Sequence, residues 1–288
     1  MASTIPFRRV AIIGTGLIGG SFALALRRQF AEVSLVGFSR SGSAARAVER
    51  GAVDDAAADL AAAVRGADLV YIALPIGASI EALATIAKSA EPHALVTDAG
   101  STKSAICRAA RDHFRGGTFF LGGHPMAGKE QSGIDQADAN LFRGAPYVLM
   151  GNEANADPRA RQFEEVARAI GARPVWCDPD THDWAVGIVS HLPQLVAVAL
   201  ARVVQDETDE TGLPLSLAGQ GLQDTLRLAG SPYSVWRDIL LTNTDNVSRA
   251  LDRLAQAVDF LRTHLASKDL EQEFAGANAL YKMLRKPE

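Results

Sequence analysis

The chain has 288 residues, of which 48% are hydrophobic and 22% charged, as is typical of a soluble globular protein long enough for two domains. The formal net charge of −4 provides no attraction for nucleic acid or an anionic membrane surface, so we expect neither partner. Cys107 and Cys177 lack metal-ligand spacing, which favours reduced thiols in a cytoplasmic protein. Residues 1–9 are too short and polar for a signal peptide, and no cluster of residues predicts a metal.

Short apolar runs alternate with alanine-rich helical segments through the first half of the chain. The predicted strands are residues 10–13, 33–38, 69–74, 95–98, 118–121 and 147–150. The predicted helices are residues 19–30, 44–50, 78–90, 104–113 and 159–170, and residues 174–176 follow as an expected edge strand. This alternation predicts an α/β fold, a doubly wound Rossmann-type sheet of mostly parallel strands with helices on both faces.

The pattern changes near residue 178. Beyond this point the chain is almost entirely helical, with breaks at residues 213–214 and 230–232. We therefore predict a dinucleotide-binding domain over residues 1–178 and an all-helical domain for substrate binding and dimerisation over residues 179–288.

Two apolar segments of the helical half need an explanation. Residues 185–204 resemble a membrane span, but His191, Gln194 and Arg202 are costly within a bilayer, so we interpret the segment as a buried helix. Farther on, apolar residues recur at spacings of four and three: Val247, Leu251, Leu254, Val258, Leu261 and Leu265. This stripe could pack inside one chain, but so much apolar surface on a small helical domain favours a homodimer.

A glycine-rich motif of the form G-x-G-x-x-G follows the first predicted strand and opens a helix. In a dinucleotide site, Gly14 permits the tight turn, Gly16 lets the backbone approach the pyrophosphate, and Gly19 allows close helix–strand packing. A tight turn without a ligand is the simpler alternative. The expected cofactor-binding residues are Gly14, Gly16, Leu17, Ile18, Gly19, Ser39, Arg40, Leu74, Pro75 and Ser101.

The end of the second predicted strand indicates which dinucleotide binds. An NAD site usually has an acid there, but this chain has no acid between residues 38 and 48. Arg40, with Ser39, Ser41 and Ser43, suits a 2′-phosphate instead. We therefore expect NADP, with NAD as the alternative and a solvated loop arginine as the simpler explanation of Arg40.

His124 lies in the glycine-rich segment G-G-H-P-M-A-G, directly after an apolar run. Histidine titrates nearest neutrality, which suits proton transfer, although a turn residue would look the same. Three other segments have polar groups out of character with their surroundings: D-A-G-S-T-K at 98–103, S-H-L-P-Q at 190–194 and D-T-L-R at 224–227. Taken singly, each has an ordinary structural explanation.

Taken together and in this order, these motifs resemble the prephenate dehydrogenase family, which includes arogenate and cyclohexadienyl dehydrogenases. The resemblance runs from about Val10 to Asn246, and W-R-D-I at 236–239 adds to it. It implies an oxidative decarboxylation in tyrosine biosynthesis, with hydride transfer to a nicotinamide and formation of an aromatic product. The histidines outside these motifs, His93, His113, His182 and His264, are assigned no role.

The resemblance also implies roles for individual residues. His124 would accept the proton of the substrate's 4-hydroxyl and must be neutral to do so, so activity should fall on acidification through its pKa, about 6.5 if unperturbed. Ser101 would lie between nicotinamide and substrate, and Arg227 would bind a substrate carboxylate. The remaining expected substrate-binding residues are His191, Ser231 and Trp236.

Several alternatives stay open on sequence alone. Prephenate is favoured over arogenate because residues 226–236 contain no acid to pair with an ammonium, although Asp224 or a dimer mate could supply one. A 3-hydroxyacid-type dehydrogenase and a non-catalytic dinucleotide sensor are the rival classes. We expect neither a preceding chorismate mutase domain nor a following ACT domain, so any inhibition by tyrosine should act at or near the active site.

Overall fold

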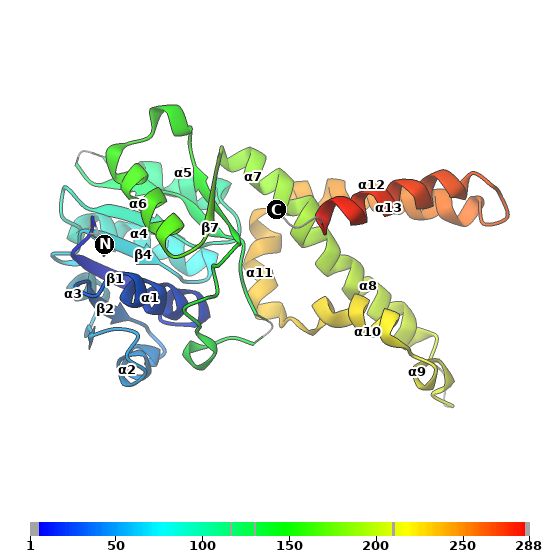
Figure 1. Ribbon diagram of the computed structural model, residues 1–288, viewed down its shortest axis with the longest axis horizontal. Coiled ribbons are helices and arrows are strands. Elements are labelled where there is room, and N and C mark those ends of the chain that lie inside the picture. The colour runs from blue at the N-terminus through cyan, green and yellow to red at the C-terminus, as the bar shows by residue number, and fades with distance from the viewer. Residues whose placement is uncertain (1–5, 116, 130, 209–210, 286–288) are drawn as a thin grey trace.

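The computed structural model describes residues 6–115, 117–129, 131–208 and 211–285. It consists of an α/β body, from which a helical part extends to one side (Figure 1). Six parallel strands of the body form one sheet in the order β3-β2-β1-β4-β5-β6. These strands are β1 (Arg9–Ile13), β2 (Ser34–Phe38), β3 (Asp55–Ala56), β4 (Leu69–Ile72), β5 (Leu95–Asp98) and β6 (Phe119–Leu121).

Alternating side chains of the strands build a core on each face of this sheet. Val10 and Ile12 of β1 pack on one face, whereas Ala11 and Ile13 belong to the core on the other. The first face is covered by α1 (Leu17–Gln29) and α6 (Pro158–Ala169). The second is covered by α3 (Leu60–Val64), α4 (Ile76–Ser89) and α5 (Ser104–His113), while α2 (Ser43–Glu49) follows β2. The predicted doubly wound Rossmann-type architecture is therefore confirmed.

A second, three-stranded sheet extends the body. It consists of β7 (Gly123–Pro125), β8 (Pro146–Met150) and β9 (Arg173–Cys177), in the order β7-β8-β9. β7 runs antiparallel to β8, and β9 is the edge strand that the sequence predicted. Sequence reasoning missed β3, α3 and β7. β3 and β7 have only two and three residues and no apolar run, and the five apolar residues of α3 are too few to show a helical period.

Among the described residues after β9, every regular element is a helix or a helical turn. α7 (Pro179–Val186), a π-helical turn (Gly187–His191) and α8 (Leu192–Asp206) form one continuous helix. The later elements are α9 (Leu213–Ser216), α10 (Gln220–Leu226), a 3-10 turn (Arg227–Gly230), α11 (Tyr233–Thr242), α12 (Thr244–Thr263) and α13 (Leu270–Leu284).

The helix from Pro179 to Asp206 has the length and hydropathy of a membrane span, yet its N-terminal part is used for packing. The Asp183 carboxylate within it accepts hydrogen bonds from the backbone N–H groups of Lys103 and Ser104, at 2.7 and 2.9 Å. These bonds attach α7 to the N-terminus of α5. Only 28% of its most apolar window is buried within the chain, so the expected buried helix is only partly covered here.

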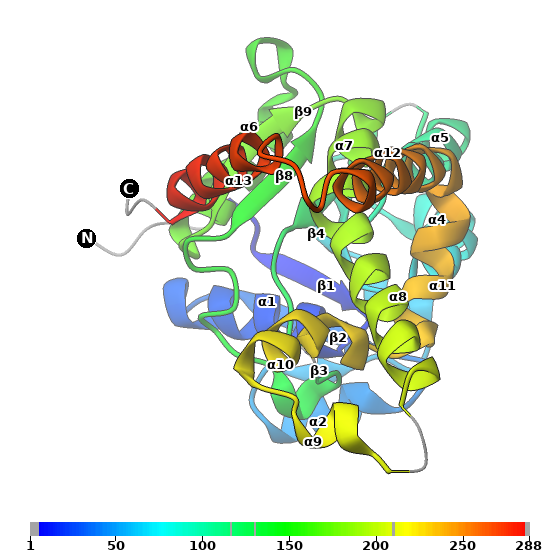
Figure 2. The same cartoon turned by 90° about the vertical axis from the view of Figure 1, so that its right-hand side faces the viewer.

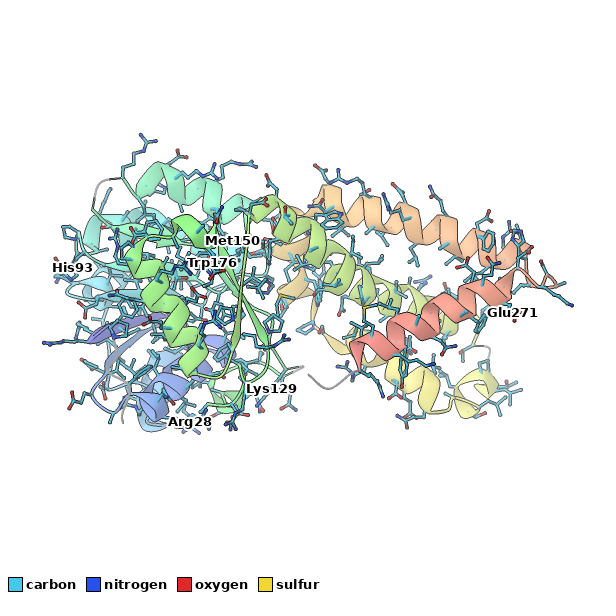
Figure 3. The ribbon with its side chains drawn as sticks, turned by 45° about the horizontal axis from the view of Figure 1, so that its top comes forward. Arg28, His93, Lys129, Met150, Trp176 and Glu271 are labelled. Atoms are coloured by element: carbon cyan, nitrogen blue, oxygen red, sulfur yellow. The ribbon has the colours of Figure 1, made fainter. Side chains whose placement is uncertain are left out.

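Helices α12 and α13 project away from the body as an arm (Figure 1), and Figure 2, which faces the end of this arm, shows the two helices diverging. Figure 3 shows Glu271 near the tip of this arm, on the opposite side of the molecule from His93. Of the predicted apolar stripe, Val247 at the base of α12 is buried. Leu251, Val258 and Leu261 are exposed, so most of the stripe finds no cover within the described chain.

Candidate active site

The glycine motif forms a cradle at the start of α1. Gly14 has φ +97°, and a Cβ on it would lie 2.3 Å from the carbonyl oxygen of Ala73. A Cβ on Gly19 would lie 1.9 Å from the carbonyl oxygen of Gly14, so both positions require glycine. Gly16 faces open space, and no side chain caps the first N–H groups of α1. An uncapped helix N-terminus beside an open backbone fits the diphosphate of a dinucleotide.

The remaining expected cofactor residues lie along the same edge of the sheet. Leu74 and Pro75 follow β4 at its carboxyl end. After β2, the Ser43 hydroxyl donates to Ser39 at 2.9 Å. The Arg40 guanidinium extends into solvent, with only a 3.8 Å contact to the exposed Glu81 carboxylate. The loop therefore combines hydroxyl groups with an exposed cation at the end of β2.

The six residues that the sequence singled out for catalysis and substrate binding line one cavity of about 440 Å³. They come from both parts of the chain: the loop after β5, β7, the π-helical turn, the 3-10 turn and α11. Arg227 is exposed at the rim, whereas the two histidines are buried. These residues are Ser101, His124, His191, Arg227, Ser231 and Trp236.

His124 is bound to a partner that sequence reasoning dismissed. Its Nδ1 lies 2.8 Å from Nε2 of His182, and Nδ1 of His182 lies 2.8 Å from the Asp183 carboxylate. All three side chains are buried. Nothing in the sequence connects His182 with His124, since 58 residues separate the two rings and only the fold brings them together.

The proton positions in the hydrogen-bonded series Asp183–His182–His124 follow from Asp183. A carboxylate only accepts, so Nδ1 of His182 carries a proton, and when the ring has that one proton its Nε2 offers a lone pair to His124. His124 must then donate from Nδ1, which leaves its Nε2 as a lone pair. Burial is the main cause that holds the pKa of His124 well below its ordinary 6.5, and the nearby Lys103 ammonium acts in the same direction. The ring is thus a neutral proton acceptor at pH 7.

The Asp183 carboxylate anchors the hydrogen-bonded series Asp183–His182–His124. Burial acts to raise its pKa, but hydrogen bonds from His182 and from the N–H groups of Ser104 and Lys103 outweigh burial and hold it below the usual value. A carboxylate that stays ionised keeps His182 in the Nδ1–H form.

A buried ion pair holds the Ser101 loop against the strand that contains His124. The Lys103 ammonium contacts the Asp98 carboxylate and donates to the carbonyl oxygen of Gly123 at 2.7 Å. Asp98 in turn accepts from the N–H groups of Gly123 and Gly100, at 3.1 and 2.8 Å. The sequence showed the polar segment but gave no sign that its lysine would be fully buried.

His191 lies deeper in the same cavity. It is 1% exposed, and its ring meets that of Trp236 edge to face with 5.8 Å between centroids. Burial lowers the pKa of His191 to about 4, so this ring is also neutral at pH 7. A neutral histidine in a cavity offers a directional hydrogen bond rather than a charge.

Fold and site together define a class: a Rossmann-type oxidoreductase that binds a nicotinamide dinucleotide beside a cavity with a neutral histidine. Residues 22–176 match the model of the prephenate dehydrogenase nucleotide-binding domain, and residues 178–283 match that of the prephenate dehydrogenase dimerization domain. The chain belongs to the prephenate dehydrogenase family.

Similar proteins span most of the chain. The prephenate dehydrogenase of Bacillus subtilis is 32% identical over 92% of this chain and 72% of the relative. A crystal structure of prephenate dehydrogenase from Aquifex aeolicus, in complex with hydroxyphenyl propionate and NAD+, has a TM-score of 0.86 at 28% identity and covers 98% of this chain and 99% of its own. That of Synechocystis arogenate dehydrogenase has a TM-score of 0.79 at 33% identity and covers 95% and 99%.

Proposed function

We propose that this protein catalyses the oxidative decarboxylation of prephenate to 4-hydroxyphenylpyruvate and carbon dioxide, with hydride transfer to a nicotinamide. The observation that carries this proposal is the Asp183–His182–His124 chain, which leaves a lone pair on a neutral ring inside the cavity. The family and its curated members support the same reaction.

In the proposed mechanism, His124 Nε2 accepts the proton of the 4-hydroxyl. Bound nicotinamide supplies the hydride acceptor. Removal of the proton lets the carbinol oxygen form a carbonyl as the hydrogen on the same ring carbon leaves as hydride. The ring carboxylate then leaves as carbon dioxide, and the electron pair of the broken C–C bond makes the ring aromatic with a phenolate oxygen. Ser101 orients the hydroxyl, and the Arg227 guanidinium binds a carboxylate at the rim. His124 then returns its proton to the phenolate, so the base is regenerated.

The lining of the cavity favours prephenate over arogenate. Its described lining residues include the cations Lys129 and Arg227 but no aspartate or glutamate. Asp224, which could have supplied a carboxylate, is exposed on α10 and hydrogen-bonded to Gln220 instead. Among these described residues, the ammonium of arogenate would lack a paired charge, whereas the keto group of prephenate needs none. Arogenate or dual specificity remains the second candidate, supported by the likeness to Synechocystis arogenate dehydrogenase.

The reaction is tested by following dinucleotide reduction with prephenate, arogenate and a 3-hydroxyacid in turn. We expect prephenate to give the highest kcat/KM. His124→Asn should lower kcat by about 10²- to 10⁴-fold, the range of general base catalysis. Absence of turnover with both cyclohexadienes would refute the proposal, and full activity of His124→Asn would refute the assigned base.

For the cofactor, we propose NADP, bound with its 2′-phosphate near Arg40 and the serine hydroxyls. Arg40→Ala should raise KM for NADP+ about tenfold, because a charge-assisted hydrogen bond is lost, and leave KM for NAD+ unchanged. Arg46→Ala is the matched control, since Arg46 lies on α2 and pairs with Glu49. Equal changes for both dinucleotides, or a lower KM for NAD+ in the wild type, would favour NAD.

We also propose that the chain has two domains and forms a homodimer. The division near residue 178 separates a cofactor domain from a helical domain whose exposed stripe is covered by a second copy, as the match to a dimerization domain supports. We place the protein in the cytoplasm because both cysteines are free thiols. Tyrosine should compete with prephenate if it inhibits at all, so inhibition that prephenate cannot relieve would contradict an active-site mode.

A further inference from the structure

Asn243, between α11 and α12, lies directly behind the substrate cavity. It is 4% exposed, and its Nδ2 lies 3.2 Å from Nδ1 of His191. The same Nδ2 donates to the carbonyl oxygen of Asp183 at 2.7 Å. On its other side, Oδ1 accepts from Nδ2 of Asn246 at 2.8 Å. Every polar atom of this amide is therefore in use.

The orientation of the amide follows from its partners. The Asp183 carbonyl can only accept, so the group that faces it must be the NH₂ of Asn243. The Asn246 amide is oriented independently, because its Oδ1 accepts from the Arg249 guanidinium at 2.6 Å and its NH₂ therefore faces Asn243. Both ends require the same orientation, so Asn243 presents a donor to His191 Nδ1.

We infer that Asn243 is a positioning residue that fixes His191 as the Nε2–H tautomer, so that His191 presents a permanent hydrogen-bond donor to the substrate. A donor at Nδ1 requires a lone pair there, which leaves the proton of the neutral ring on Nε2. Nε2 has no hydrogen-bond partner among the described residues and is not sealed in the core, and the ring lines the cavity. The acceptor class is a carboxylate or keto oxygen, which rests on the proposed function.

His191 and His124 thus line one cavity with opposite proton arrangements. Nδ1 of His124 faces an acceptor, His182, so the ring offers a lone pair at Nε2. Nδ1 of His191 faces a donor, Asn243, so this ring offers a proton at Nε2. The low pKa of His191, about 4, keeps its ring neutral near pH 7 and is consistent with this assignment.

The π-helical turn makes room for this contact. A Cβ on Gly187, its first residue, would lie 3.3 Å from Asn246 Cβ and 3.5 Å from Asn243 Nδ2. Glycine at this position lets the start of α12 approach closely enough for the amide to reach the ring. π-Turns within helices recur at functional sites, where they re-aim a side chain.

The test is the tautomer of His191, read from long-range ¹H–¹⁵N correlations of the ¹⁵N-histidine-labelled full-length protein near pH 7.5. In the wild type, Nδ1 of His191 should resonate as the unprotonated nitrogen and Nε2 as the protonated one. The reverse pattern, or a mixture of the two tautomers, would overturn the inference without any assay. Signals are assigned by comparison with His191→Gln.

Variants connect the tautomer to binding. Asn243→Asp cannot donate, so Nδ1 of His191 should become protonated, and KM for prephenate should rise about tenfold or more while kcat changes less. Thr242→Val is the matched control, since Thr242 bonds Thr102 at 2.7 Å and does not contact His191. Its His191 signals and KM should equal those of the wild type.

The outcomes separate this inference from the proposed function. A shifted tautomer with unchanged KM would overturn the donor role, and an unchanged tautomer in a folded Asn243→Asp would overturn the positioning role. If Asn243→Asp does not fold, Asn243→Ala, which also cannot donate to Nδ1, and the wild-type signals provide the test. Inactivity of the wild type toward prephenate would count against the proposed reaction, while the histidine signals would still decide the tautomer.

Discussion

His182 provides the sharpest perturbation of the proposed mechanism, because it contacts the proposed base His124 and does not itself line the cavity. Replacing His182 by leucine keeps much of the volume but removes the acceptor of the His124 Nδ1–H group. The proton of His124 is then free to move to Nε2, which would remove the lone pair that faces the substrate. The change therefore tests the proton arrangement rather than the presence of His124.

The expected size follows from burial. His182 is 2% exposed, so no water replaces the lost partner, and an unsatisfied buried donor costs about 1–3 kcal/mol. At about 1.4 kcal/mol for each factor of ten, kcat should fall by about 10- to 100-fold. KM for the dinucleotide should not change, because no cofactor-binding residue is altered. His182→Gln, whose side-chain oxygen can accept the same hydrogen bond, should recover part of the loss.

Initial rates of prephenate-dependent dinucleotide reduction, measured from pH 5 to 9, provide the assay. His93→Leu is the matched control, since His93 is 66% exposed and pairs only with Asp68 at 3.3 Å (Figure 3). It should behave as the wild type. A folded His182→Leu enzyme with wild-type kcat and an unchanged pH profile would refute the reasoning.

Three further predictions concern stability and assembly. His191 has a folded pKa of about 4 against an unfolded value near 6.5, so between these pH values the unfolded chain binds a proton that the folded chain does not. The free energy of unfolding, measured by urea titration, should therefore fall by up to about 3 kcal/mol between pH 6.5 and 4. This loss should be absent in His191→Gln. Lys103→Met should destabilise by about 3–5 kcal/mol by leaving Asp98 buried and unpaired, and adding Asp98→Asn should restore part of it, as urea unfolding would show. Leu261→Asp should shift the protein toward monomer in sedimentation, and an unchanged mass would contradict a dimer through this stripe.

The sequence by itself determined the architecture of the body and the location of the cofactor cradle. Both depend on local patterns, since apolar runs at βαβ spacing and glycines around Gly16 have one efficient packing solution. The motifs around Ser101, His124 and Arg227 likewise identified residues that the fold brings to one cavity.

Only the tertiary structure decided how the histidines are protonated. His182 lies within α7 without any local signal, yet it contacts His124 across 58 residues, and Asn243 reaches His191 across 52. A tautomer depends on what lies at the second ring nitrogen, and that neighbour comes from another element of the fold. The sequence shows that the two histidines are present, whereas the packing of α7 and of the start of α12 decides which group faces Nδ1 of each ring, and the proposed acceptor and donor roles rest on those contacts.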